Sequence, residues 1–180
     1  KIETLSVFPH CYDSVMGESM MRIAQEKGIL EFTAHDLRDW THDKHRTTDD
    51  EPYGGGQGLV MKCEPIFEAT DELFSQALAK PYTIFLSPTG EVFNEAIALE
   101  LSQKEHLFFI CGHYEGIDER AYSLADRVLS IGDYVLEEAC RQCRYWNEHG
   151  MPDFHINVNL SVVQLLQKDI VCLLYTSDAA

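Results

Sequence analysis

The sequence predicts an α/β protein with a mainly parallel β-sheet and helices on both of its faces. Three short apolar runs, at residues 82–86, 107–111 and 128–131, have the composition of buried strands and are each followed by small or polar residues. Segments with helical spacing, at residues 92–101 and 118–126, follow the first two of these runs. Ligands of parallel α/β sheets bind beyond the carboxyl ends of the strands, so we expect the functional site there.

The amino-terminal part is expected to supply two further strands and a helix. Residues 2–8 alternate weakly between polar and apolar side chains and precede Pro9, which predicts the first strand. Residues 12–27 carry apolar side chains close to helical spacing, and Gly28 follows them in the position that commonly ends a helix. Residues 29–34 are predicted to form the second strand.

The middle of the chain is polar and then rich in glycine. Residues 36–50 predict a long loop, and residues 52–58 (PYGGGQG) contain too many glycines to form regular structure without a large loss of backbone entropy. Residues 59–61 predict a short strand. Residues 64–79 predict a helix with Pro65 in its first turn, where proline is tolerated.

Composition and charge limit the class of protein. The 180 residues are 45% hydrophobic and 24% charged, as in a folded domain, and no apolar run approaches the length of a membrane span. No signal peptide is visible, and six cysteines without a small-secreted-protein spacing favour free thiols in the cytoplasm. The net charge of −16 argues against a polyanionic partner unless basic residues are segregated.

The glycine-rich stretch permits two interpretations. It is not a P-loop, because no Gly-Lys-Ser/Thr follows, and Leu59 stands where a dinucleotide-binding fingerprint needs glycine. It is either a turn between elements or a backbone surface that a nucleotide or a partner chain approaches closely.

Two histidine-containing segments raise the question of metal binding. In the segment His42–Arg46, the histidines and Asp43 have poor ligand spacing, so we expect either a solvated loop or phosphate contact through Lys44 and Arg46. A zinc site is suggested by the four residues Cys140, Cys143, His149 and His155. The gaps between them are shorter than the usual spacing of zinc fingers, which argues against that interpretation. We expect no metal.

The loop after residues 107–111 carries the most reactive set of side chains. Tyr114 and Glu115 lie between two glycines, and a carboxylate at the end of a strand can serve as an acid, a base or a ligand acceptor. Asp118 and Glu119 follow, where acidic residues also favour the start of a helix. Both interpretations can hold together.

Four motifs are hard to place in any other context. They are WTHDKHRTTDDEPYGGGQGLVMK (40–62), FLSPTG (85–90), ICGHYEGIDER (110–120) and SIGDYVL (130–136). In this order they resemble the bacterial tRNA (guanine-N1)-methyltransferases of the SPOUT class. The resemblance implies a sheet with a trefoil knot at the carboxyl end of its strands. It also implies transfer of a methyl group from S-adenosylmethionine to N1 of the guanine at position 37, directly 3′ of the anticodon in tRNA.

The same resemblance implies site residues and partners. The cofactor would be held by Ser87, Pro88, Gly112, Tyr114, Glu115, Gly116, Ile131, Gly132, Asp133, Tyr134, Val135 and Leu136. The tRNA would be contacted by Lys44, Arg46, Asp50, Gly55 and Gly56. Members of the family act as homodimers, with tRNA lying across both chains.

The sequence departs from the family pattern after Leu136. Residues 1–136 are therefore expected to form the cofactor-binding domain, and residues 137–180 stay unassigned, with a shift of reading frame as the preferred explanation. Asp153 and Asp169 lie outside any matching motif, so no residue is assigned as the catalytic base, and the family's carboxyl-terminal tRNA-binding domain is not matched. The alternatives are an inactive cofactor- or RNA-binding fragment, and an acidic or zinc-bearing interaction protein.

Overall fold

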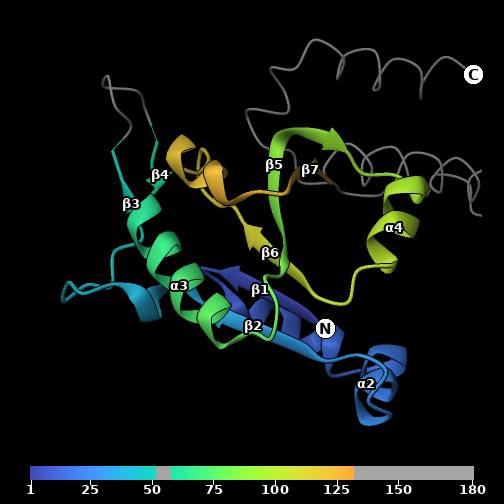
Figure 1. The fold of residues 1–180 in the computed structure, drawn as a ribbon. Helices are drawn as coiled ribbons and strands as arrows, with labels where there is room; N and C mark the ends of the chain where they lie inside the picture. Colours follow the sequence, from blue (N-terminus) through green and yellow to red (C-terminus); the bar gives the residue numbers. More distant parts are fainter. Residues whose placement is uncertain (52–57, 132–180) are drawn as a thin grey trace, which may run out of the picture.

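Five parallel strands organise residues 1–51 and 58–131, the part of the chain that the computed structural model describes (Figure 1). Their order in the sheet is β2-β1-β6-β5-β7, and every neighbouring pair is parallel. The strands are β1 (Ile2–Ser6), β2 (Phe32–Asp36), β5 (Tyr82–Val92), β6 (Leu107–Cys111) and β7 (Arg127–Ser130). The predicted α/β class with a mainly parallel sheet is confirmed.

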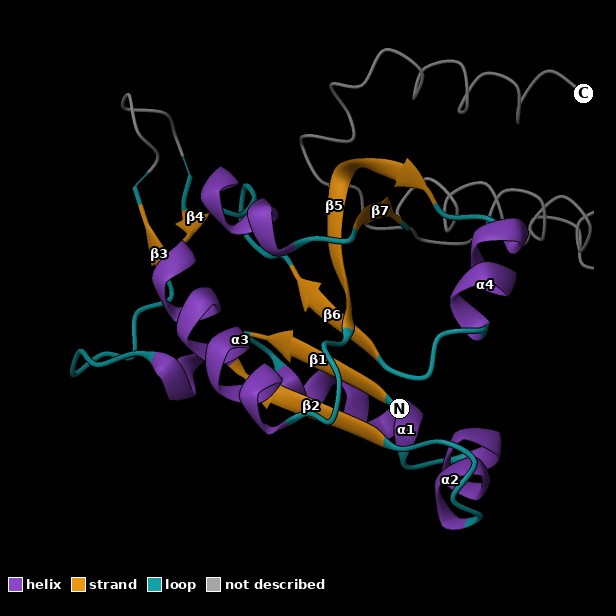
Figure 2. Ribbon diagram, in the orientation of Figure 1, coloured by secondary structure: helices purple, strands orange, loops and turns teal. Residues whose placement is uncertain are grey.

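Helices cover both faces of this sheet, as expected from the buried strands (Figure 2). Successive side chains of a strand point to opposite faces. On β5 and β6, Phe85 and Phe108 belong to the core cluster that contains Ile66 of α3 (Cys63–Gln76). Their neighbours Ile84 and Leu107 belong to the second cluster, together with residues of α4 (Glu95–Ser102).

The predicted helix over residues 12–27 is divided into shorter pieces. They are η1 (Pro9–Tyr12), α1 (Asp13–Met16) and α2 (Ser19–Glu26). Gly17 ends α1, with its N–H donating to the Asp13 carbonyl, and Glu18 is extended before α2 begins. Most apolar side chains of this segment stay outside the core, and Val15 and Met20 are 63% and 79% exposed.

The second strand begins at Phe32, not at residue 29 as predicted. The cause is the end of α2, where Gly28 adopts φ +67°. The N–H groups of Ile29 and Leu30 both donate to the Ala24 carbonyl, at 2.9 and 3.2 Å. These two residues therefore close the helix and cannot pair with β1.

The predicted loop over residues 36–50 contains regular structure at both of its ends. Asp36 caps η2 (Leu37–Trp40) by accepting a hydrogen bond from the Arg38 N–H at 2.9 Å, and Leu37 is fully buried. At the other end, β3 (Asp49–Asp50) pairs antiparallel with β4 (Val60–Met61). The residues between η2 and β3 extend away from the sheet (Figure 1).

Caps explain the remaining shifts of helix ends. α3 ends at Gln76 because Ala77 is extended, and α4 starts only after Asn94, whose side chain accepts from the Ile97 N–H at 3.0 Å. The helix predicted over residues 118–126 is the 3₁₀ helix η3 (Glu119–Leu124), capped by Asp118. None of the helices within residues 1–51 and 58–131 has the length and apolar character needed to cross a membrane.

Candidate functional site

The carboxyl ends of β6 and β7 lie on either side of the middle of β5. Leu86 of β5 pairs with Cys111 at the end of β6 on one side and with Leu129 of β7 on the other. A Cβ atom built on Gly112 would lie 3.1 Å from the Leu86 carbonyl oxygen, so the loop after β6 runs directly against β5. Of the predicted cofactor residues in the described ranges, Ser87 and Pro88 follow Leu86, Gly112 lies against Leu86, and Ile131 directly follows β7. Tyr114, Glu115 and Gly116 lie further along the loop, where it approaches β4.

The segment Ser87–Gly90 does not end its strand, contrary to the prediction. It lies inside β5, which continues to Val92, and the pairing with β7 shifts so that both Leu86 and Glu91 oppose Leu129. Gly90 allows this second pairing, because a Cβ atom there would lie 2.6–2.8 Å from the Leu129 backbone. The Ser-Pro-Thr-Gly motif is therefore an irregular stretch within a strand, which bends beside the site (Figure 2).

The loop Gly112–Gly116 presents polar groups to solvent. Tyr114 and Glu115 are both exposed, and Tyr114 has φ +60°, which is unusual for a residue with a side chain. A Cβ atom on Gly116 would meet nothing within 4 Å, so open space adjoins the backbone at that residue. Unusual backbone geometry of this kind is most often found where a protein binds a ligand.

The glycine-rich segment is joined to this loop, a contact that the sequence analysis missed. The Glu115 N–H donates to the Leu59 carbonyl at 3.0 Å, and the Met61 N–H donates to the Gly116 carbonyl at 2.9 Å. The Asp118 N–H then donates to the Met61 carbonyl at 2.9 Å. β4 and the loop therefore run side by side in parallel. The only signal in the sequence is the short apolar run that follows Gly58, which predicts a strand over residues 59–61 but does not indicate its neighbour.

Gly58 and Glu115 are packed so closely that a side chain at position 58 would require Glu115 to move. A Cβ atom on Gly58 would lie 2.3 Å from Glu115 Cγ, and Gly58 has φ +101°. A side chain there would push the Glu115 carboxylate away from its position. Gly58 therefore helps to determine where the acidic group of the loop lies.

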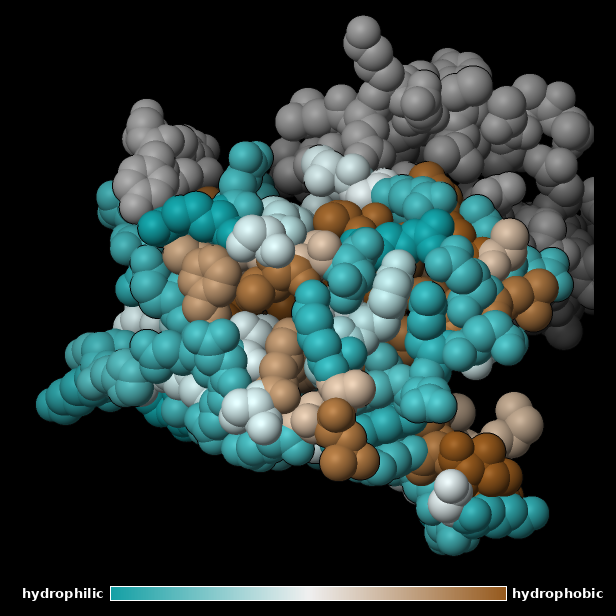
Figure 3. All heavy atoms as spheres, in the orientation of Figure 1, coloured by the Kyte–Doolittle hydropathy of each residue, from teal (hydrophilic) through white to brown (hydrophobic). Residues whose placement is uncertain are grey.

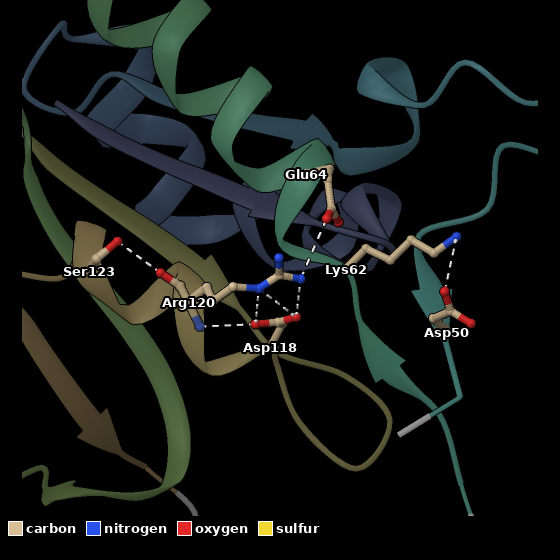
Figure 4. Close-up of polar contacts among 6 residues, drawn as sticks. All are labelled: Asp50, Lys62, Glu64, Asp118, Arg120 and Ser123. Atoms are coloured by element: carbon tan, nitrogen blue, oxygen red, sulfur yellow. Dashed lines mark hydrogen bonds and ion pairs between the residues drawn. The ribbon is translucent and has the colours of Figure 1, made fainter. Parts of the chain in front are cut away.

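Behind this loop, charged side chains surround a cavity of about 490 Å³ between β4, α3 and η3. The Arg120 guanidinium lies 2.7 Å from an Asp118 oxygen and 3.5 Å from Glu64, as Figure 4 shows. The hydrogen bond from Arg120 is the largest effect on Asp118 and lowers the pKa of its carboxyl group. These pairs connect the loop that follows β6 to the start of α3.

The predicted tRNA contacts are partly neutralised within the chain. Arg46 pairs with Asp39, and its Nε donates to the Arg38 carbonyl at 3.2 Å. The Asp50 carboxylate lies 3.9 Å from Lys62 Nζ (Figure 4). Lys44 is exposed and forms no ion pair with any residue of the described ranges.

Several predicted residues fall outside the described ranges. They are Gly55, Gly56 and Gly132–Leu136, together with residues 137–180 and the cysteines and histidines weighed there as a zinc site. Within the described ranges, His42 contacts Glu68 at 2.7 Å, and Asp43 accepts hydrogen bonds from the His45 and Thr47 N–H groups. Residues 1–51 and 58–131 contain no group of three or more His, Cys, Asp or Glu side chains that could hold a metal ion.

The arrangement suits a flat, polar ligand such as a nucleoside. The exposed loop offers backbone donors and acceptors next to glycines, one carboxylate on Glu115 and one aromatic ring on Tyr114. Carboxylates accept hydrogen bonds from hydroxyl and amino groups, and aromatic rings stack on bases. These groups come from residues close together in the chain, so folding of β6 and β4 is enough to assemble them.

Comparison with known proteins gives a consistent result. The family model described as "tRNA (Guanine-1)-methyltransferase TrmD" matches residues 1–140. The tRNA (guanine-N(1)-)-methyltransferase of Dictyoglomus turgidum is 50% identical over 136 residues, covering 76% of this chain and 54% of that protein. The enzyme of the same name from Bacillus subtilis is 46% identical over 137 residues, covering 76% and 56%. The chain thus spans about half the length of these relatives.

A solved structure agrees with this relationship. The crystal structure of tRNA (m1G37) methyltransferase from Aquifex aeolicus superposes with a TM-score of 0.67 at 29% sequence identity. The match covers 99% of this chain and 88% of that one.

Proposed function

Since the chain belongs to the tRNA (guanine-1)-methyltransferase family, we propose that it transfers a methyl group from S-adenosylmethionine to N1 of guanine 37 in tRNA. The observation that carries this proposal is that the carboxyl ends of β6 and β7 flank Leu86 of β5, against which the loop Gly112–Gly116 begins. This is the position at which parallel α/β sheets bind nucleotides. The name of the Aquifex protein supplies the position of the guanine in the tRNA.

The residues at the strand ends fit S-adenosylmethionine. Open space lies beside the Gly116 Cα atom, so an adenosine group can approach the backbone there without meeting a side chain. The exposed Glu115 carboxylate can accept hydrogen bonds from ribose hydroxyls or from an ammonium group. Ser87 and Pro88 of β5 and Ile131 after β7 would form the walls on the opposite side. We extend the site to Gly132–Leu136, which continue the chain after Ile131.

Positioning is the main task that we assign to these residues. When bound, S-adenosylmethionine supplies an electrophilic methyl group on a sulfonium, and the attacking nitrogen must lie in line with the bond that breaks. Gly58 and the loop Gly112–Gly116 would hold the two reactants at this distance and angle. Because guanine N1 carries a proton at neutral pH, a general base is also required. We assign that role to none of the residues in the described ranges.

Binding of tRNA requires a surface that offsets the charge of −16. The segment Lys44–Arg46 extends from the sheet on the side where β3 and β4 lie (Figure 1) and carries the exposed Lys44 ammonium group. Asp50 and the glycines Gly55 and Gly56 follow in the chain and complete the proposed RNA-facing segment. This placement agrees with a cytoplasmic protein whose substrate is tRNA.

We also propose that the chain works as a homodimer, and the exposed apolar side chains of α1 and α2 support this. Val15 of α1 and Met20 and Ile23 of α2 are exposed, although Met20 and Ile23 have the i, i+3 spacing of one apolar helix face. Apolar side chains gather over α2, at the lower right of Figure 3. Exposed apolar patches on soluble proteins commonly mark contacts with another chain.

The proposal is tested by methyl transfer with the chain as it stands. Purified protein is incubated with S-adenosylmethionine labelled in the methyl group and with tRNA transcripts carrying guanine or adenine at position 37. We expect label in the guanine transcript alone, recovered as 1-methylguanosine after digestion. Equal labelling of both transcripts, or label at another base, would refute the assignment. Glu115→Gln should reduce transfer. Glu119→Gln, which changes an exposed carboxylate at the start of η3, outside the loop Gly112–Gly116, is the matched control.

A further inference from the structure

Three aromatic rings lie in contact at the carboxyl edge of the sheet. Phe8, in the segment after β1, meets His113 edge to face with ring centroids 4.8 Å apart, and His113 meets Tyr114 at 4.6 Å. We call these three residues the aromatic row. Phe8 is 48% exposed and Tyr114 is 37% exposed, although side chains of this size and apolar character usually lie in the core. Their exposure therefore calls for a partner that covers them.

The backbone fixes the row before any partner binds. The Phe8 N–H donates to Ser6 Oγ at 3.1 Å, and the Phe8 carbonyl accepts from the Cys11 N–H at 3.2 Å. The His113 N–H points at the sulfur of Met61, 3.1 Å away. Tyr114 is held at a positive φ by the pairing of its loop with β4. A surface that is already ordered loses little conformational entropy when it binds.

A cation accompanies the row. The Arg38 guanidinium lies 5.7 Å from the centroid of the Phe8 ring, and it is oriented by a hydrogen bond to the Val7 carbonyl and by Asp36 at 3.7 Å. Exposed aromatic rings beside an arginine are the combination that single-stranded nucleic acids use, because each base has a flat face for stacking and a phosphate beside it. The neighbours of Phe8 are a histidine and an arginine, so this edge offers polar and cationic groups beside the exposed ring.

We propose that the aromatic row is a stacking platform for an unpaired RNA base next to the guanine that is methylated. This rests on the proposed function, which brings an RNA loop to the strand ends. His113 and Tyr114 belong to the loop Gly112–Gly116. When the guanine of an RNA enters the site at this loop, a nucleotide next to that guanine lies over the aromatic row. Stacking tolerates any base but requires that the base be unpaired. The row would therefore select a loop over a duplex.

The test uses an RNA hairpin whose loop copies the anticodon loop, with 2-aminopurine in turn at the loop positions beside guanine 37. Stacking on an aromatic ring quenches the fluorescence of 2-aminopurine. With the wild-type chain we expect quenching at one of these positions, and about tenfold weaker hairpin binding with loss of quenching in Phe8→Leu and His113→Ala. Tyr82→Leu, which removes a ring at the amino end of β5, is the matched control and should change neither the hairpin affinity nor the quenching.

The remaining measurements separate a stacking role from other causes. Phe8→Leu should keep the wild-type Tm, the wild-type affinity for S-adenosylmethionine and the wild-type salt dependence of RNA binding, because no phosphate contact is removed. Wild-type hairpin binding and quenching in both variants would overturn the platform and leave the proposed function standing. A wild-type chain that binds no hairpin would overturn both. A changed sedimentation coefficient in the variants, with RNA binding unchanged, would show that the row contacts protein and would also overturn the platform.

Discussion

The contact between Gly58 and Glu115 determines the geometry of the candidate site at the scale of single residues. Gly58 is needed because of its positive φ and because Glu115 Cγ occupies the space of a side chain. A residue that precedes β4 thereby controls the position of a carboxylate that follows β6. The two motifs are far apart in the chain, and their backbone hydrogen bonds bring them together.

We predict that Gly58→Ala weakens the binding of S-adenosylmethionine at least tenfold. The new methyl group displaces Glu115, while the positive φ costs about 1 kcal/mol of folding free energy. Isothermal titration gives the affinity and thermal unfolding gives the stability. Gly28→Ala is the control, because Gly28 also has a positive φ but a Cβ atom there meets nothing within 4 Å. Equal loss of affinity in both variants would contradict the role of the Glu115 contact.

A second residue-scale feature is the buried carboxylate of Glu3. Its oxygens lie 2.5 Å from Lys1 Nζ, 2.6 Å from His35 Nε2 and 3.1 Å from His106 Nε2. Burial acts to raise the pKa of Glu3, but the hydrogen bonds from Lys1 and His35 outweigh it, and the pKa lies below its ordinary value of 4.5. Burial also lowers the pKa of His106 below 6.5. Both groups therefore favour their deprotonated forms in the folded state.

We predict that this cluster makes stability fall as the pH is lowered. A group whose pKa is lower in the folded protein than in the unfolded chain contributes stability. This contribution is complete above the pKa of the unfolded chain and is lost as the pH falls through the pKa of the folded protein. The loss begins below pH 6.5 through His106 and continues below pH 4.5 through Glu3. Glu3→Gln should cost about 1–3 kcal/mol at pH 7 and flatten the acidic part of the profile. Parallel profiles of Tm against pH for the two proteins would refute this prediction.

At the scale of elements, the strand β5 forms the centre of the site. It pairs with β6 on one side and twice with Leu129 of β7 on the other, so residues 87–90 protrude between the two pairings. This irregular stretch places Ser87 and Pro88 beside the loop that follows β6. The close approach of Gly90 to the β7 backbone fixes the second pairing.

We predict that Gly90→Ala destabilises the fold more than any substitution at the neighbouring Thr89. A Cβ atom at residue 90 would lie 2.6 Å from a backbone atom of Leu129, which cannot move as a side chain can. Forced overpacking of this kind costs about 1–3 kcal/mol. Chemical denaturation of Gly90→Ala and Thr89→Ala measures the difference. Equal stabilities would mean that β7 shifts freely relative to β5.

The strands of the sheet were predictable because their apolar runs are short, β-rich and bounded by glycine or proline, and the range of β6 was predicted without error. The observed helix ends differ from the predicted ones where a capping side chain decides the boundary, as at Asn94 and Asp118. The exposed α2 could not be foreseen, because helical spacing alone does not say what covers an apolar face. The pairing of β4 with the loop after β6 was missed, because two-residue strands carry almost no pattern.

At the scale of the whole molecule, the described residues form one five-stranded sheet and the short β3–β4 pair, with the candidate site at the strand ends of the larger sheet. The exposed apolar side chains of α2 lie on a different part of the surface (Figures 1 and 3). The chemistry and the proposed assembly surface are therefore separable by mutation. Residues that bind the cofactor can be changed without touching α2, and the reverse also holds.

We predict that Met20→Glu shifts the chain from dimer to monomer in sedimentation velocity. Met20 is 79% exposed on α2, so a charge there costs nothing in the free chain but must be desolvated in an apolar contact. Leu78→Glu, in the exposed segment after α3, is the control and should leave the sedimentation coefficient unchanged. A Met20→Glu protein that stays dimeric would place the dimer contact elsewhere.

The central claim is that the ends of β6 and β7, the irregular stretch of β5 at residues 87–90 and the loop Gly112–Gly116 form the binding site of S-adenosylmethionine. Calorimetric titration of the full chain with S-adenosylmethionine tests it most directly, with circular dichroism to establish that the sample is folded. We predict saturable binding at a single site per chain, weakened at least tenfold by Glu115→Ala. A folded sample that binds no S-adenosylmethionine, or that binds it equally well after Glu115→Ala and Gly58→Ala, would contradict the assignment.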